Sequence, residues 1–302
     1  MLYIVAQMKN LGIFLLMIKY LRFVKFSHTV FALPFALIGF TLGAMYNDYH
    51  ADKAIFIYVL LCMITARTAA MAFNRLIDSK YDAANPRTAL REIPRGIISV
   101  QAALVLVLLS SLLFCFFSYC INSLCFVLSP IALIVILGYS YLKRFTSLCH
   151  LVLGLGLSFA PIGAYIACTS RFDVLPILFS LVVLTWVCGF DIIYALQDEE
   201  FDRYHGLKSI PVALGKKNAL FLARIIHGIC AIILIYIWQY MQWHYFFTIG
   251  MILFLLALFI QQSLVRHDDL SRVNMAFFTT NGIASIVFGV FTIGAIIWKH
   301  IF

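Results

Sequence analysis

Nine apolar stretches dominate the sequence, each close to the length that crosses a membrane as a helix. Hydrophobic residues make up 64% of the chain and charged residues only 12%. Soluble domains carry about twice that share of charge. We therefore expect an all-α integral membrane protein, with spans at approximately residues 29–46, 54–73, 100–118, 121–138, 150–168, 174–194, 219–240, 245–264 and 275–297.

Lys and Arg residues are unevenly divided between the loops. If the N-terminus is cytoplasmic, seventeen of the 22 fall in the first 28 residues or in the loops on that side, and three fall on the other side. This asymmetry predicts an odd number of spans, with the C-terminus outside. Membrane orientation and attraction to anionic lipid account for most of the net charge of +9, so we expect no nucleic-acid partner.

Residues 1–28 are interpreted as a cytoplasmic or interfacial segment, and residues 29–302 as a single transmembrane domain. The apolar run at 11–18 is too short to span a bilayer and precedes no small-residue cleavage site. We expect an interfacial helix there. Nothing in the sequence indicates an obligate protein partner.

Asn74, Asp78 and Asp82 recur every four residues at the end of the second span. On a helix this spacing places the three side chains on one face, one turn apart. Amide and carboxylate oxygens at a membrane surface suit Mg²⁺, which is usually shared with substrate phosphates. This first series therefore predicts a magnesium site.

A second acidic series ends the sixth span, where Asp191, Tyr194, Asp198 and Asp202 are spaced three, four and four residues apart. Both series lie on the same predicted side and could face each other across a cavity. Opposed carboxylates bridged by metal can ionise an allylic diphosphate, because the metal neutralises charge on the leaving group. A solvated helix end explains one such series, but it poorly explains two of them with Asp191 inside the membrane zone.

The segments around these series resemble the two signature motifs of the UbiA superfamily of intramembrane aromatic prenyltransferases. The first series is followed by Asn85-Pro86-Arg87-Thr88, and the second by Gly206 and Lys208-Ser209-Ile210-Pro211. The resemblance covers most of the chain up to about residue 215. The flanking residues look like the bacterial branch usually labelled 4-hydroxybenzoate polyprenyltransferase.

This resemblance implies a bundle of nine transmembrane helices around a central cavity open to lipid, in the bacterial cytoplasmic (inner) membrane. It implies Mg²⁺ as cofactor, with a polyprenyl diphosphate and an aromatic acid of the 4-hydroxybenzoate type as substrates in respiratory quinone synthesis. A dihydroxynaphthoate acceptor, used for menaquinone, remains open.

The resemblance also assigns roles to residues. The implied metal ligands are Asn74, Asp78, Asp82, Asp198 and Asp202. The implied diphosphate contacts are Arg87, Lys143, Arg144 and Lys208. Arg suits that role because its planar fork can donate two hydrogen bonds to one phosphate.

The expected catalytic residues are Asp191, Asp78 and Asp198. Asp191, the deepest residue of its series, is expected to contact the phenol or to accept a ring proton. Acceptor contacts are expected from Asp191, Tyr194, Arg67 and Arg22. Arg67 lies inside the second span and has two open interpretations: it pairs with Asp191 or a carbonyl group, or it binds the acceptor carboxylate. Arg22 suits a lipid headgroup equally well.

A membrane transporter is the alternative from a different class, because Asp191 and Arg67 could mark an ion path. A transporter predicts charged residues spread through the depth of the bilayer. This sequence instead gathers them near one surface, which favours the enzyme.

Overall fold

The structure is a computed structural model that describes residues 18–46, 52–242 and 244–301. Within these ranges nine helical segments are long and apolar enough to cross a membrane, and no β-strand occurs. The prediction of an all-α protein with nine spans is confirmed. The interfacial helix expected at 11–18 lies, except for its last residue, outside the described residues.

The elements follow the apolar stretches closely, and α3 extends four residues beyond the predicted end. In chain order they are η1 (Phe26–Phe31), α2 (Leu33–Tyr46), α3 (Lys53–Ile77), α4 (Ser79–Ala84), α5 (Val100–Ile121), α6 (Ser123–Leu142), α7 (Cys149–Thr169), α8 (Val174–Ala195), η2 (Leu196–Asp198), α9 (Glu199–Tyr204), α10 (Ile210–Tyr240), α11 (Tyr245–Leu264), α12 (Val273–Met275), η3 (Ala276–Thr280) and α13 (Asn281–Ile301).

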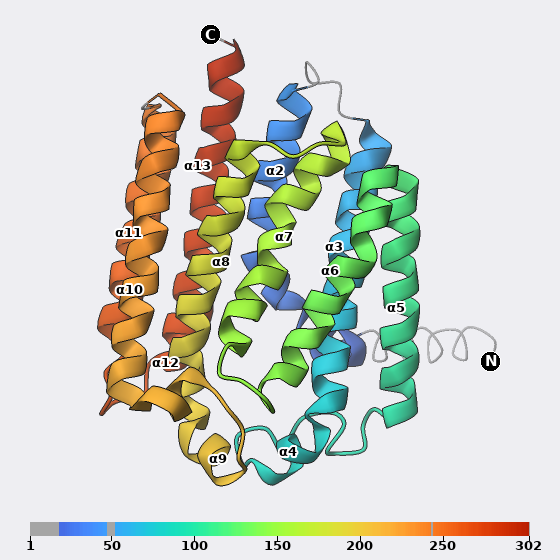
Figure 1. The fold of residues 1–302 in the computed structure, drawn as a ribbon, viewed down its shortest axis with the longest axis vertical. Helices are drawn as coiled ribbons and strands as arrows, with labels where there is room; N and C mark the ends of the chain where they lie inside the picture. The colour runs from blue at the N-terminus through green and yellow to red at the C-terminus, as the bar shows by residue number, and fades with distance from the viewer. Residues whose placement is uncertain (1–17, 47–51, 243, 302) are drawn as a thin grey trace, which may run out of the picture.

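Successive spans alternate in direction, so alternate connections gather at the same end of the bundle (Figure 1). The short helices α4 and α9 lie together at one end, which we call the loop end, and α13 finishes at the opposite end. The loop end comprises the connections at 78–99, 143–148, 196–209 and 265–272. Both acidic series reach this end.

One side of the bundle is a solid aromatic core. Trp186 on α8 packs against Phe35 on α2 and Phe254 on α11, with ring centroids 5.4 and 5.5 Å apart. All three side chains are fully buried. The indole Nε1 donates a 3.0 Å hydrogen bond to Asn281 Oδ1, which satisfies its one polar atom. This core holds α8, the helix that carries the second acidic series.

α7 approaches α8 closely at Gly154. A Cβ atom at this position would lie 2.5 Å from the carbonyl oxygen of Leu184. Small residues allow such close backbone contact between membrane helices. Because α7 begins only five residues earlier, at Cys149, this contact sets where the first turn of α7 lies against α8.

We predict that Gly154→Ala lowers the thermal stability of the detergent-solubilised protein. The added Cβ forces the two backbones apart, a change that costs about 1–3 kcal/mol in packed interiors. Gly163→Ala, on the same helix, is the matched control, because a Cβ there meets no atom within 4 Å. Equal unfolding midpoints for the two variants would contradict the proposed close contact.

Candidate active site

A polar pocket of about 540 Å³ occupies the loop end of the bundle. Its lining includes every member of both acidic series, namely Asn74, Asp78, Asp82, Asp191, Tyr194, Asp198 and Asp202. The two series, more than a hundred residues apart in the sequence, therefore meet across one cavity, as their spacing predicted.

The first series crosses a break between two helices without losing its helical spacing. α3 ends at Ile77 and α4 begins at Ser79. The backbone N–H groups of Asp78 and Asp82 nevertheless donate to the carbonyl groups four residues earlier, at 3.0 and 2.8 Å. Asn74 Nδ2 donates to Asp78 Oδ2 at 3.1 Å, so these two side chains share a face.

The second series begins in α8 with Asp191 and Tyr194 and continues through η2 and α9. Its last two carboxylates are deeply placed: the side chain of Asp198 is 12% exposed and that of Asp202 is 1% exposed. Buried carboxylates are costly unless they are paired. The loops at this end supply the partners.

Two of these pairs join segments that are distant in the sequence. Arg87 donates from Nε and Nη2 to the two oxygens of Asp198, with 2.9 Å between Nε and Oδ1, and from Nη1 to Tyr194 Oη at 3.0 Å. Lys143 Nζ lies 2.8 Å from Asp202 Oδ1. The connections after α4 and α6 are thereby fastened to η2 and α9.

The first series has its own cations. Arg91 Nη1 lies 2.6 Å from Asp82 Oδ1, and Arg144 Nη2 lies 3.1 Å from Asp78 Oδ1. Arg144 also donates to the carbonyl oxygen of Ile77 at 2.9 Å, so it closes the end of α3. Each of the four aspartates nearest the loop end therefore has a basic partner.

Burial and charge together set the pKa values of groups that lie outside the spans. Burial raises the pKa of the Asp78 carboxyl group, although Arg144 and Lys143 act against it. Burial acts to lower the pKa of the Lys143 ammonium group, but the Asp202 carboxylate outweighs it and the pKa is raised. The same balance, with Asp198 as partner, raises the pKa of Arg87. Both basic groups stay charged at neutral pH.

Two carboxylate oxygens in the pocket wall remain unpartnered. Asp82 Oδ2 and Asp202 Oδ2 are buried and accept no hydrogen bond from any residue that the structure describes. Hard anionic oxygens of this kind are the ligands that Mg²⁺ prefers. Among the described residues no three His, Cys, Asp or Glu side chains converge to enclose an ion, but Mg²⁺ shared with a phosphate needs only one or two carboxylates. The donor set fits Mg²⁺.

Asp191 is paired with a residue that the sequence did not single out. His150 Nδ1 lies 2.7 Å from Asp191 Oδ2. Arg67 makes no hydrogen bond to Asp191 or to a carbonyl group in the described part of the chain, and its Nε is buried without a partner. The interpretation of Arg67 as the partner of Asp191 is not realised here, since His150 occupies that place.

Three predicted residues lie outside the pocket lining. Arg22 and Lys208 are exposed. Arg144 reaches the pocket indirectly, through contacts with the lining residues Asp78, Ser140 and Tyr81. Lys208 contributes its main chain, whose N–H donates to the carbonyl oxygen of Lys143 at 2.7 Å.

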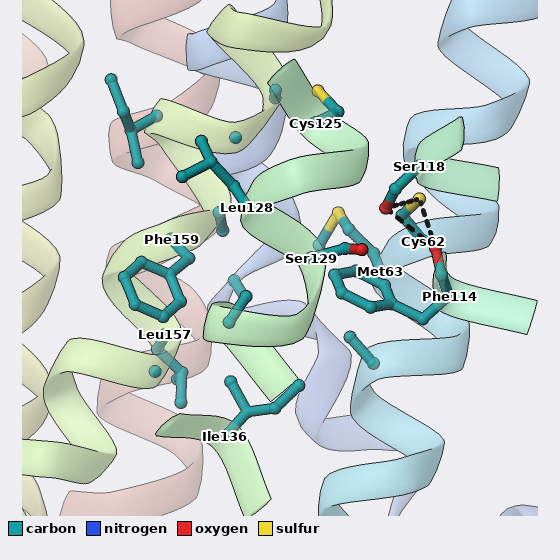
Figure 2. A pocket seen from close by; sticks show the side chains of 18 of the residues that line it. Cys62, Met63, Phe114, Ser118, Cys125, Leu128, Ser129, Ile136, Leu157 and Phe159 are labelled. Atoms are coloured by element: carbon teal, nitrogen blue, oxygen red, sulfur yellow. Dashed lines mark hydrogen bonds between the residues drawn. The ribbon is translucent and has the colours of Figure 1, made fainter. Parts of the chain in front are cut away.

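A second cavity, apolar and about 350 Å³ in volume, lies between α3, α5, α6 and α7. Figure 2 shows side chains such as Leu128 and Phe159 arranged around it. The Ser118 and Ser129 hydroxyl groups in its wall donate to carbonyl oxygens of their own helices at 2.8 Å. The wall therefore offers little polarity to a ligand.

The apolar cavity adjoins the polar pocket. Four residues line both of them: Arg67, Tyr139, Leu153 and Leu157. A molecule with a charged head and a long apolar tail would fit the pair, with its head among the aspartates and its tail between the four helices.

Comparison with known proteins identifies the family. The model of the UbiA prenyltransferase family matches residues 32–283, most of the chain. The chain belongs to this family. It is therefore an integral membrane prenyltransferase, and the transporter alternative is set aside.

Curated relatives match this UbiA family member over most of its length. It is 31% identical over 238 residues to the 4-hydroxybenzoate octaprenyltransferase of Tolumonas auensis, covering 76% of this chain and 82% of the relative. The protein of the same name from Coxiella burnetii is 27% identical over 271 residues, covering 89% and 93%.

Solved structures of UbiA homologues have the same fold. The apo structure of a homologue from Aeropyrum pernix K1 matches with a TM-score of 0.79 at 32% identity, covering 91% of this chain and 98% of that one. A homologue from Archaeoglobus fulgidus, bound to DMAPP and Mg²⁺, matches with a TM-score of 0.74 at 21% identity, covering 92% and 99%.

We predict that Lys143→Met destabilises this family member by up to about 3 kcal/mol, because it leaves the Asp202 carboxylate buried without a cation. Adding Asp202→Asn should restore much of the loss. Arg266→Met is the control, since Arg266 and its partner Asp268 are both exposed and such surface pairs contribute about 1 kcal/mol or less. Thermal unfolding measures all of these variants, and a loss in Lys143→Met no larger than in the control would contradict the buried pairing.

Proposed function

We propose that this protein transfers a polyprenyl group from polyprenyl diphosphate to an aromatic acid of the 4-hydroxybenzoate type, with Mg²⁺, in respiratory quinone synthesis. The observation that carries the proposal is the junction of the charged pocket with the apolar cavity at Arg67 and Tyr139. The names of the curated relatives support the choice of substrates.

Mg²⁺ would be held by Asn74, Asp78, Asp82, Asp198 and Asp202. The unpartnered oxygens of Asp82 and Asp202 support this assignment, and the Archaeoglobus fulgidus homologue binds Mg²⁺ together with DMAPP. When bound, the ion neutralises charge that develops on the leaving diphosphate.

The basic residues of the pocket orient the diphosphate. Arg87 and Lys143 line the pocket and carry full charge, so each can donate hydrogen bonds to phosphate oxygens. Arg144 acts through Asp78, which it holds at 3.1 Å. Lys208 remains an outer contact, because its exposed side chain lies outside the pocket lining.

The transfer step uses the shared wall of the two cavities. The bond between prenyl C1 and the diphosphate oxygen breaks, and its electron pair leaves with the diphosphate. The ring carbon ortho to the acceptor hydroxyl group forms the new bond to C1. Asp191 accepts the ring proton, since its Oδ1 accepts no hydrogen bond from the described residues and Asp191 lines the pocket.

The acceptor itself would lie beside Asp191 and Tyr194. Arg67, whose buried Nε has no partner, is our candidate for its carboxylate. Arg22 is exposed and outside the pocket, which favours contact with lipid headgroups. A dihydroxynaphthoate has the same phenol and carboxylate groups, so menaquinone synthesis is the alternative pathway.

The loop end faces the cytoplasm of a bacterial inner membrane in this proposal. The excess of Lys and Arg in the N-terminal segment and the loops of that end supports the orientation. The substrates, Mg²⁺ and membrane lipid are its partners, and no protein partner is required.

We predict that Asp78→Ala and Asp198→Ala each reduce prenyl transfer by at least about a hundredfold, which corresponds to roughly 2.7 kcal/mol of transition-state stabilisation. The assay offers the purified protein Mg²⁺, a polyprenyl diphosphate, and either 4-hydroxybenzoate or a dihydroxynaphthoate. Glu200→Ala is the matched control, because this carboxylate lies close by in α9 but is exposed and outside the pocket. Undiminished transfer in the two aspartate variants would refute their roles, and metal-dependent diphosphate release without transfer to either acceptor would refute the acceptor class.

We further predict that Gly163→Phe shifts the preference of the enzyme toward shorter prenyl diphosphates. The ring can enter the apolar cavity, because Gly163 lines it and a Cβ there meets no atom within 4 Å. Excluding even two methylene groups of a long tail, at about 0.8 kcal/mol each, changes the ratio of kcat/KM for short and long prenyl diphosphates about tenfold. Gly228→Phe, at an equally open but lipid-facing position on α10, should leave the ratio unchanged; an unchanged ratio in Gly163→Phe would argue against this cavity as the tail site.

A further inference from the structure

His150 is a buried, titratable residue of the pocket that neither the sequence motifs nor the mechanism above uses. It lies in the first turn of α7, its relative exposure is 3%, and it lines the polar pocket beside Asp191. Both ring nitrogens have partners, which come from two different elements.

The partners of His150 fix the position of its proton. Ile210 donates its backbone N–H to His150 Nε2 at 3.3 Å. An N–H group can only donate, so Nε2 is the unprotonated nitrogen, and the hydrogen-bond pattern assigns the proton to Nδ1. Nδ1 then donates to Asp191 Oδ2 across 2.7 Å.

The kind of partner sets Asp191 apart from the other aspartates of the pocket. Asp78, Asp82, Asp198 and Asp202 each contact an Arg or Lys residue. Asp191 instead contacts the imidazole ring of His150. A carboxylate that must accept a proton beside an allylic cation needs both its charge and a fixed direction.

The His150–Asp191 hydrogen bond lies beside a separate backbone contact between α7 and α8. One turn further along α7, Gly154 already brings the two backbones into contact. What the ring adds is orientation, because it ties down Oδ2 of Asp191 and leaves Oδ1 without a hydrogen-bond partner.

The chain segment 207–210, which we call the clamp segment, holds His150 from the other side. Leu207 N–H donates to the carbonyl oxygen of Asp202 at 2.8 Å, and Lys208 N–H donates to that of Lys143 at 2.7 Å. Ile210 N–H then reaches His150. The clamp segment thus contacts Lys143 and Asp202, the charged pair at the diphosphate end of the pocket. It also contacts His150, the partner of Asp191.

We infer that His150 is a positioning residue for Asp191, holding that carboxylate so that its Oδ1 faces the aromatic acceptor. The inference rests on the proposed function, in which Asp191 takes the ring proton. It assigns His150 to the acceptor half of the reaction and not to ionisation of the diphosphate.

The test compares His150→Phe with His150→Gln in two assays on the purified protein. The first measures prenyl transfer to the aromatic acid, and the second measures metal-dependent diphosphate release without acceptor. Phe keeps a ring but removes both hydrogen bonds, whereas the Gln amide can still accept from Ile210 and donate to Asp191. If His150→Phe does not fold, His150→Leu takes its place.

We expect His150→Phe to lower kcat for transfer by about 10–100-fold, as losses of orienting partners commonly do. Diphosphate release and the KM for polyprenyl diphosphate should stay as in the wild type, and His150→Gln should recover most of the transfer rate. In an Asp191→Asn background, His150→Phe should add no further loss, because the two residues act as one unit.

Equal losses in transfer and in diphosphate release would make His150 a structural residue and overturn the inference. So would undiminished transfer in His150→Phe, or losses that multiply in the Asp191→Asn background. Wild-type protein that releases diphosphate but prenylates neither acceptor overturns the proposed function, and the inference with it. If the wild type prenylates an acceptor and His150→Phe does so at the same rate, the inference is overturned but the proposed function stands.

Discussion

The architecture of this protein depends on pairing charges at the edge of a membrane. Aspartates at helix ends beside lipid are costly when they stand alone. Here the connection after α4 supplies Arg87 to Asp198, and the connection after α6 supplies Lys143 to Asp202. The same contacts that relieve buried charge also tie the loops over the helix ends. The pocket is therefore shaped by electrostatics, and the basic residues that shape it are the ones we propose as diphosphate contacts.

The bundle divides into a rigid part and a hollow part. Around Trp186 the helices α2, α8, α11 and α13 interlock through aromatic rings. On the other side, α3, α5, α6 and α7 surround a cavity. α8 belongs to the rigid part, so Asp191 and Tyr194 are carried on a fixed wall. In the proposed function the prenyl tail lies among these helices, which leave space for it.

The local features of this protein were readable from its sequence. The apolar stretches predicted most span boundaries to within a few residues, although α10 begins nine residues before the predicted start at 219. The spacing of Asn74, Asp78 and Asp82 predicted a shared face, because helical periodicity depends only on neighbours. The pairings were not readable. Arg87 and Asp198 are 111 residues apart, and His150 and Asp191 are 41 apart. His150 stands outside any motif, and only the packing of α7 on α8 brings it into contact with Asp191.

The first and last spans of the chain are locked together. Ser285 Oγ on α13 donates to the carbonyl oxygen of Val30 at 3.0 Å, and a Cβ at Gly289 would lie 2.6 Å from Pro34 Cβ. During synthesis α13 follows the other eight spans of the described chain, so the aromatic core beside α2 stays incomplete until α13 has been made. Both acidic series precede α13 in the sequence, but the packing that fixes α8 requires it. The wall that carries Asp191 and Tyr194 is therefore completed only when α13 packs against α2.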